Sequence, residues 1–75
     1  MSERLPAVNG AAVVRALERF GFAVTHIVGS HHVMRHPDGR RTSVPVHAGR
    51  DVPKGTLAGI LRDARLSRSD LRRSL

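Results

Sequence analysis

The sequence of 75 residues predicts a small α+β domain, a three-stranded antiparallel sheet with helices on one face. Two observations predict it. Apolar residues recur at helical spacing over residues 10–20 and again over about 53–65. Between these segments lie three short runs rich in β-branched residues, separated by turns that contain glycine. We expect one domain over residues 1–75, with its core in about 9–66 and a short last helix in about 68–74.

The first helix has a start signal and a stop signal. Val13 and Leu17 fall on one face of a helix over residues 10–20. Asn9 is a good N-cap because its side-chain oxygen can accept a hydrogen bond from a free backbone N–H of the first turn. Gly21 stands where a residue in the left-handed conformation commonly ends a helix.

Three strands and two turns follow the first helix. Gly29-Ser30 interrupts the first apolar run, and Pro37-Asp38-Gly39 is a turn sequence. Pro45 cannot donate to a sheet ladder, so the third strand ends there or runs along an edge. The strands are predicted at residues 22–28, 31–36 and 41–44, as an antiparallel meander.

The second helix, over about 53–65, presents an apolar stripe. Asp51 is predicted as its N-cap, and Pro53 suits a first turn, where its missing N–H costs little. Ser67 is predicted to cap the short last helix. Two helices suffice to bury one face of a sheet of this size, so we expect the other face to be open to a ligand or partner.

The charge of the chain favours an anionic partner. Thirteen Lys and Arg against six Asp and Glu give a net charge of +7, and all but Lys54 of the thirteen are arginine. A planar guanidinium donates two parallel hydrogen bonds to phosphate oxygens. The excess therefore points to a nucleic acid. The alternatives are a solvated basic surface and a docking face for an acidic protein.

Composition also limits the class of protein. With no cysteine there is neither a disulfide nor a thiolate metal site. No apolar run reaches the roughly 18 residues that span a bilayer, and the N-terminal segment lacks a signal-peptide core. We expect a cytoplasmic protein without membrane contact.

Three of the five histidines lie in residues 31–36, on the predicted second strand. Histidine can take or give a proton near neutral pH. Strand alternation puts His31 and Arg35 on one face and Met34 on the other. If Met34 faces the helices, a phosphate on the open side can reach both His31 and Arg35. The alternative is that His31 is only a polar residue at the start of a strand.

His32 and His36 share a strand face, but they are too far apart along the strand to chelate a metal easily without a third ligand. We therefore predict no metal site. His32 is expected to be half-buried, and His36 to hydrogen-bond into the Pro37-Asp38-Gly39 turn.

Five pieces of the sequence, in order, resemble those of the HicA toxins, the mRNA-cleaving partners of HicB antitoxins. The resemblance covers about residues 9–66. Its pieces are Gly21-Phe22, Gly29-Ser30-His31, His36-Pro37-Asp38-Gly39, Val44-Pro45-x-His47, and Gly55-Thr56-Leu57 with Ile60-Leu61. Two positions depart from the pattern, since Met34 replaces a larger aromatic residue and Arg65 replaces a frequent glycine.

The resemblance implies a fold like that of double-stranded-RNA-binding domains and a ribonuclease activity without a known metal requirement. The catalytic histidine of the family follows Gly-Ser, which corresponds to His31. The resemblance further implies a HicB-type antitoxin that masks His31 and the open sheet face. No small-molecule cofactor is implied.

Further residues are predicted to assist His31. His47 is either a second acid or base, or a loop residue that orients the backbone. Arg40, Arg41, Arg50 and Lys54 are expected to cluster around the hairpin and the start of the second helix, as phosphate contacts or as an ordinary basic patch. The predicted RNA contacts are Gly29, Ser30, Arg35, Arg40, Arg41, Arg50 and Lys54.

The sequence thus predicts the toxin of a toxin–antitoxin system, an endoribonuclease that cleaves mRNA and halts translation. With neither Trp nor Tyr, the chain offers few aromatic side chains on which RNA bases could stack, so weak sequence specificity is expected. The alternative is a non-catalytic RNA- or DNA-binding module that uses the same basic face. A protein-interaction adaptor is a third interpretation.

Overall fold

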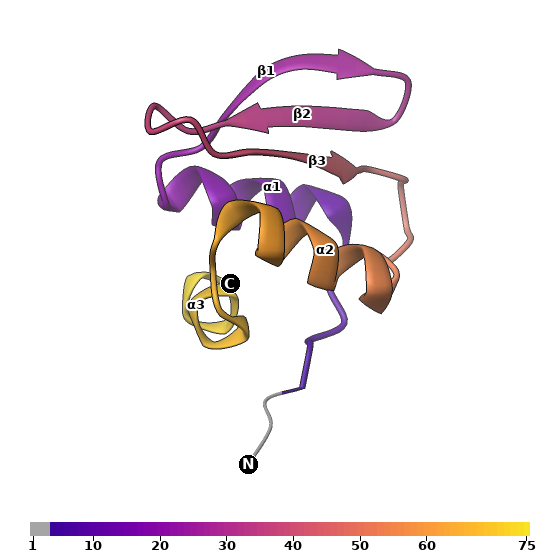
Figure 1. Cartoon of the computed structure of the whole chain (residues 1–75). Helices are drawn as coiled ribbons and strands as arrows, with labels where there is room; N and C mark the ends of the chain where they lie inside the picture. Colours follow the sequence, from indigo (N-terminus) through magenta and orange to yellow (C-terminus); the bar gives the residue numbers. More distant parts are fainter. Residues whose placement is uncertain (1–3) are drawn as a thin grey trace.

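The computed structural model describes residues 4–75 and has the predicted α+β architecture (Figure 1). Residues 1–3, which the predicted domain includes, lie outside the described residues. No helix within residues 4–75 is long and apolar enough to cross a membrane. The elements are α1 (Gly10–Arg19), β1 (Ala23–Val28), β2 (His31–Arg35), β3 (Arg41–Pro45), α2 (Lys54–Ala64) and α3 (Arg68–Ser74).

The three strands form an antiparallel sheet in the order β1-β2-β3, so β2 is central and β3 ends at Pro45 on an edge. Helices α1 and α2 lie against one face of this sheet, and α3 packs against α1 on the side away from the strands (Figure 1). The predicted arrangement of both longer helices on one face is confirmed.

Burial alternates along β3, whereas β1 is exposed along most of its length. Met34 and Val44 are fully buried against the helices, and both belong to the main hydrophobic core. Directly paired residues of antiparallel strands share a face of the sheet, so the strand pairing also identifies the residues on the opposite face. We call this side the open face; it carries His31, Val33, Arg35, Arg41 and Ser43.

Val33 departs from the simple alternation. It lies on the open face, yet it is only 7% exposed and does not belong to the main core. It is at the centre of the middle strand, with His26 and Ser43 directly opposite it on the two neighbouring strands. Flanking side chains therefore cover it where no helix does.

The predicted end signals of α1 and the predicted cap of α3 are confirmed. The N–H of Ala12 donates to Asn9 Oδ1 at 2.9 Å. Gly21 has a φ of +93°, and the N–H of Phe22 reaches back to the carbonyl of Leu17, as in a Schellman motif. Ser67 caps α3 in a complete capping box.

The predicted N-cap of α2 is wrong. The N-cap is Pro53, without a side-chain hydrogen bond, and Asp51 instead pairs with Asn9 in an isolated antiparallel bridge. The N–H of Val52 also donates to the carbonyl of Val8 at 2.8 Å. This pairing with residues 5–9, which we call the lead-in, holds residues 51–52 extended, so α2 begins only at Lys54. The lead-in itself contributes to the core through Leu5 and Val8, which the sequence did not predict.

The first turn of α1 touches the end of β3. A Cβ at Gly10 would lie 2.2 Å from the carbonyl oxygen of Pro45 and 2.8 Å from the Cα of Val46. Both contacts are to backbone, which cannot rotate away. Glycine at this position thus lets the chain after β3 lie directly on α1.

We expect Gly10→Ala to lower the free energy of unfolding by about 1–3 kcal/mol, because the methyl group forces α1 away from β3. Gly55→Ala is the matched control, since a Cβ there meets no atom within 4 Å. The control should leave stability unchanged or raise it by up to about 1 kcal/mol through helix propensity. Urea denaturation of both variants measures the difference, and equal stability of the two would contradict the close approach.

Candidate functional site

The β1–β2 turn presents His31 at the start of the middle strand. Gly29 has a φ of +60°, whereas Ser30 does not enter the left-handed region. This pattern fits a two-residue type II′ hairpin turn, which favours glycine at its first position. Val28 pairs with His31 across the turn, and the His31 side chain is exposed on the open face.

Backbone pairing between β2 and the chain after β3 continues beyond the sheet. His31 pairs with Pro45, and the N–H of Val46 donates to the carbonyl of Ser30 at 2.8 Å. The Ser30 hydroxyl lies 3.4 Å from His47 Nε2, within hydrogen-bond distance. The loop that carries His47 is therefore held against the turn that carries His31.

A pocket of about 350 Å³ lies where these two segments meet the start of α2. It contains two imidazoles, one guanidinium, one carboxylate and one hydroxyl group, a set suited to proton transfer and to phosphate binding. We call it the His31 pocket. Its lining residues are His31, Pro45, His47, Arg50, Asp51, Val52, Pro53 and Thr56.

Of the residues predicted to assist His31, the structure brings His47 and Arg50 into this pocket. Lys54 is the exposed first residue of α2, directly after Pro53 in the pocket wall. Asp51 also lines the pocket, although the sequence suggested only a capping role for it. Its position shortly after the Val44-Pro45-x-His47 segment was the one signal that could have suggested this.

Arg35 and Arg41 occupy the other end of the open face. They pair directly across β2 and β3, and both side chains are exposed. Within residues 4–75, neither guanidinium makes a hydrogen bond or an ion pair. Like charges directly opposite each other on a sheet repel, so this pair costs stability unless an anion binds between them.

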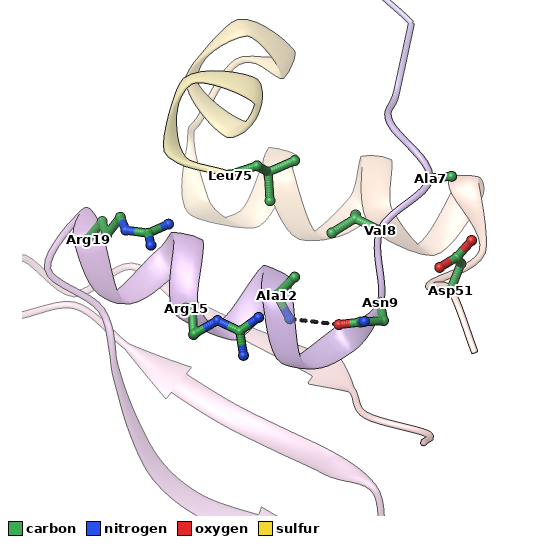
Figure 2. Close-up of a pocket in the computed structure, with 8 residues that line it drawn as sticks. All are labelled: Ala7, Val8, Asn9, Ala12, Arg15, Arg19, Asp51 and Leu75. Atoms are coloured by element: carbon green, nitrogen blue, oxygen red, sulfur yellow. Dashed lines mark hydrogen bonds between the residues drawn. The ribbon is translucent and has the colours of Figure 1, made fainter. Parts of the chain in front are cut away.

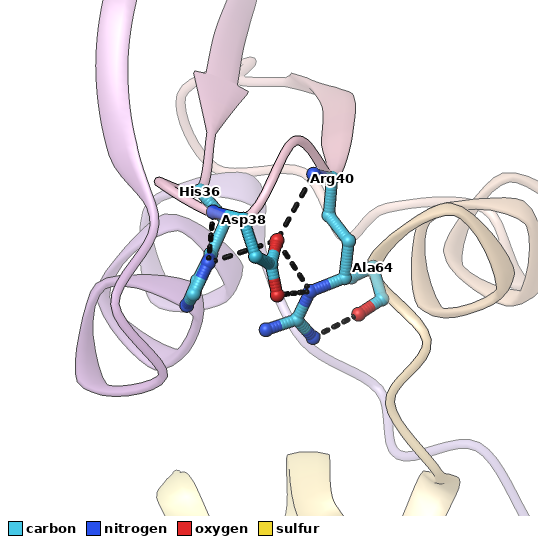
Figure 3. A network of polar contacts seen from close by, with 4 residues as sticks. All are labelled: His36, Asp38, Arg40 and Ala64. Carbon is cyan, nitrogen blue, oxygen red and sulfur yellow. Dashed lines mark hydrogen bonds and ion pairs between the residues drawn. The ribbon is translucent and has the colours of Figure 1, made fainter.

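Arg40 has structural partners instead. Its guanidinium donates from Nε to Asp38 and from Nη1 to the carbonyl of Ala64 at the end of α2, at 2.6 Å (Figure 3). It also lies over the Phe22 ring, 5.0 Å from the ring centroid. These contacts tie the β2–β3 turn to Phe22, just before β1, and to the end of α2. The Arg40 guanidinium also holds the pKa of the Asp38 carboxyl below its usual range.

His36 belongs to the same turn, as predicted. Its Nδ1 lies 3.1 Å from the backbone N–H of Asp38 and 2.9 Å from the carboxylate of that residue (Figure 3). Its ring packs edge-on against Phe22, with the centroids 5.2 Å apart. His32 is half-buried, as expected.

The predicted clustering of four basic residues is wrong. Arg40 and Arg41 lie at the end of the sheet near the last turn of α2, where Arg40 meets Ala64. Arg50 and Lys54 lie at the opposite end, beside the first turn of α2. The helix runs alongside β3, so its start and the β2–β3 hairpin are separated by the length of the helix (Figure 1).

Other parts of the surface offer less chemistry. Among residues 4–75, no three His, Asp or Glu side chains are grouped so as to hold a metal ion. A second pocket, of about 420 Å³, lies between α1, the lead-in and the C-terminus, and Arg15, Arg19 and Leu75 border it (Figure 2). No histidine lines that pocket, so it lacks a group suited to proton transfer near neutral pH.

The sequence was also compared with known proteins. A search of the curated proteins gave no match. The family model described as the HicA toxin of bacterial toxin–antitoxin systems matches residues 10–66, which run from the first residue of α1 to just past α2. This match spans the sheet, the His31 pocket and both helices that cover the sheet. The chain therefore belongs to the HicA toxin family.

Proposed function

We propose that this HicA-family toxin is an endoribonuclease that cleaves mRNA, with His31 as a group that transfers a proton at the scissile phosphate. Family membership makes it the toxin of a toxin–antitoxin system. The observation that carries the proposed chemistry is the His31 pocket, because it combines an exposed histidine with a guanidinium and a second histidine.

RNA carries its own nucleophile, the 2′-hydroxyl. Cleavage requires removal of the proton from this group, stabilisation of charge on the phosphate, and protonation of the departing 5′-oxygen. His31 can perform the first or the last of these steps. Arg50, in the same pocket, is suited to the phosphate, since a guanidinium donates to two oxygens at once. No step requires a metal ion.

The RNA strand is proposed to run along the open face from the His31 pocket to Arg35 and Arg41. Arg35 lies four residues after His31 along β2, a rise of about 13 Å, which a few nucleotides can span. Phe22 is buried and Phe20 half-buried, and the chain has neither Trp nor Tyr, so within residues 4–75 the exposed rings that could stack on bases are imidazoles. Binding through phosphates favours weak sequence preference.

The cognate antitoxin that family membership implies is proposed to cover the open face and His31. A net charge of +7 suits a partner with an acidic surface, because complementary charge speeds association. Such a partner excludes RNA from the same surface, which keeps the toxin inactive while the complex lasts.

We expect His31→Ala to lower the rate of RNA cleavage by about 10²–10⁴-fold, the usual contribution of a general acid or base. His26→Ala is the matched control, because His26 is also exposed on the open face, opposite Val33, but lies outside the His31 pocket. Its loss can weaken RNA binding, whereas the rate of cleavage of bound RNA should stay within a few fold of the wild type. The assay follows a long mRNA in EDTA, with the fold of each variant checked by circular dichroism.

Equal cleavage by the wild type and His31→Ala would remove His31 from the mechanism. Salt-sensitive RNA binding without any cleavage by the wild type would identify the chain as a non-catalytic binding module instead.

The arginine pair is tested by the salt dependence of binding. In a His31→Ala background, which keeps the RNA intact, Arg35→Gln with Arg41→Gln should lower the slope of log K against log salt by about 1.4, the value for two phosphates of a single strand. Arg15→Gln with Arg72→Gln removes the same charge from exposed helix positions away from the open face. An equal change in both double variants would show that charge alone, without a preferred face, controls binding.

A further inference from the structure

We propose that His47 is the second proton-transfer group of the site, so that His31 and His47 work as a general acid–base pair. This inference rests on the proposed ribonuclease function and adds a catalytic residue to it. His47 lies 16 residues after His31, in the loop between β3 and α2.

Three contacts hold His47 in place beside His31. The backbone bond from Val46 to Ser30 continues the β2–β3 pairing to the residue before His47. The Ser30 hydroxyl then meets His47 Nε2 at 3.4 Å. On the far side, the N–H of Arg50 donates to the His47 carbonyl at 3.1 Å and closes a turn. The backbone on both sides of His47 is therefore held, and the contact with Ser30 directs its exposed imidazole toward the turn before His31.

The surroundings of the two rings suit proton transfer. Both histidines are exposed to the pocket, which a nucleotide could enter, and Ser30 is the only side chain within residues 4–75 that hydrogen-bonds either ring. Arg50 and Asp51 are the charged residues of the pocket wall, and Lys54 follows at the start of α2. A phosphate drawn in by Arg50 would have an imidazole from each of two chain segments beside it.

The proposed step balances without a further reactant. One imidazole takes the proton of the 2′-hydroxyl while the bond from O2′ to phosphorus forms. The bond from phosphorus to O5′ breaks, and the other imidazole gives its proton to O5′. The products are a 2′,3′-cyclic phosphate and a 5′-hydroxyl, and the two imidazoles exchange protonation states, which solvent then restores.

A purely positioning role for His47 makes a different prediction. In that case His47 would support catalysis only through its contact with Ser30, which orients the turn before His31. Glutamine can keep a hydrogen bond to the Ser30 hydroxyl, but its amide cannot serve as a general acid or base near neutral pH. The comparison of His47→Gln with Ser30→Ala therefore separates the two roles.

We expect His47→Gln to lower kcat by about 10²–10⁴-fold and to remove one limb of the bell-shaped pH profile of kcat/KM. Ser30→Ala should reduce kcat far less and keep both limbs. Circular dichroism and thermal unfolding confirm that each variant is folded. Wild-type activity in His47→Gln, or an unchanged pH profile, would overturn the proposal while leaving the proposed ribonuclease function intact.

A substrate with sulfur in place of the 5′-bridging oxygen, placed at a cleavage site mapped with the wild type, identifies the acid. A thiolate leaves without protonation, because a thiol is far more acidic than an alcohol. For one of the two variants, His47→Gln or His31→Ala, the loss of cleavage rate relative to the wild type should be at least tenfold smaller on this substrate. The histidine replaced in that variant is then the general acid. If neither defect shrinks, the acid–base pair is refuted. If the wild type cleaves no RNA, the proposed function itself fails.

Discussion

The hydrogen bond from the backbone of Val46 to the carbonyl of Ser30 controls the geometry of the candidate site. It extends the β2–β3 register one step past the sheet, so that the turn carrying His31 and the loop carrying His47 cannot move independently. The same loop rests on α1, where Gly10 permits backbone contact with Pro45 and Val46. A chain with no disulfide thus positions its polar site through backbone pairing and one glycine contact.

One-sided packing explains why the remaining chemistry lies where it does. A domain this small can fill only one core, and α1 and α2 place it on one face of the sheet. The open face is left to charged and polar side chains. Among the arginines near the sheet, the Arg40 guanidinium already contacts Asp38, Ala64 and Phe22. Arg35 and Arg41, by contrast, lie opposite each other without an acidic partner within residues 4–75. The first stabilises the fold, and the other two are available for an anion.

Local signals in the sequence predicted most of the fold. Asn9, Gly21 and Ser67 act through neighbours within a few residues, so their roles could be inferred directly. Strand alternation likewise placed His31 and Arg35 opposite Met34. The errors concern contacts distant in sequence. Asp51 pairs with Asn9 instead of capping α2, and the path of α2 along β3 separates Arg40 from Lys54. Neither contact leaves a local signal.

The chemical identity of the RNA ends tests the central claim most directly. The claim is that the substrate's own 2′-hydroxyl attacks the phosphate, with histidine side chains moving the protons. RNA cleaved by the wild-type protein in EDTA should then carry 2′,3′-cyclic phosphate and 5′-hydroxyl ends, which mass spectrometry of the fragments distinguishes. Fragments with 3′-hydroxyl and 5′-phosphate ends would contradict the account, because they require attack by water instead of the 2′-hydroxyl.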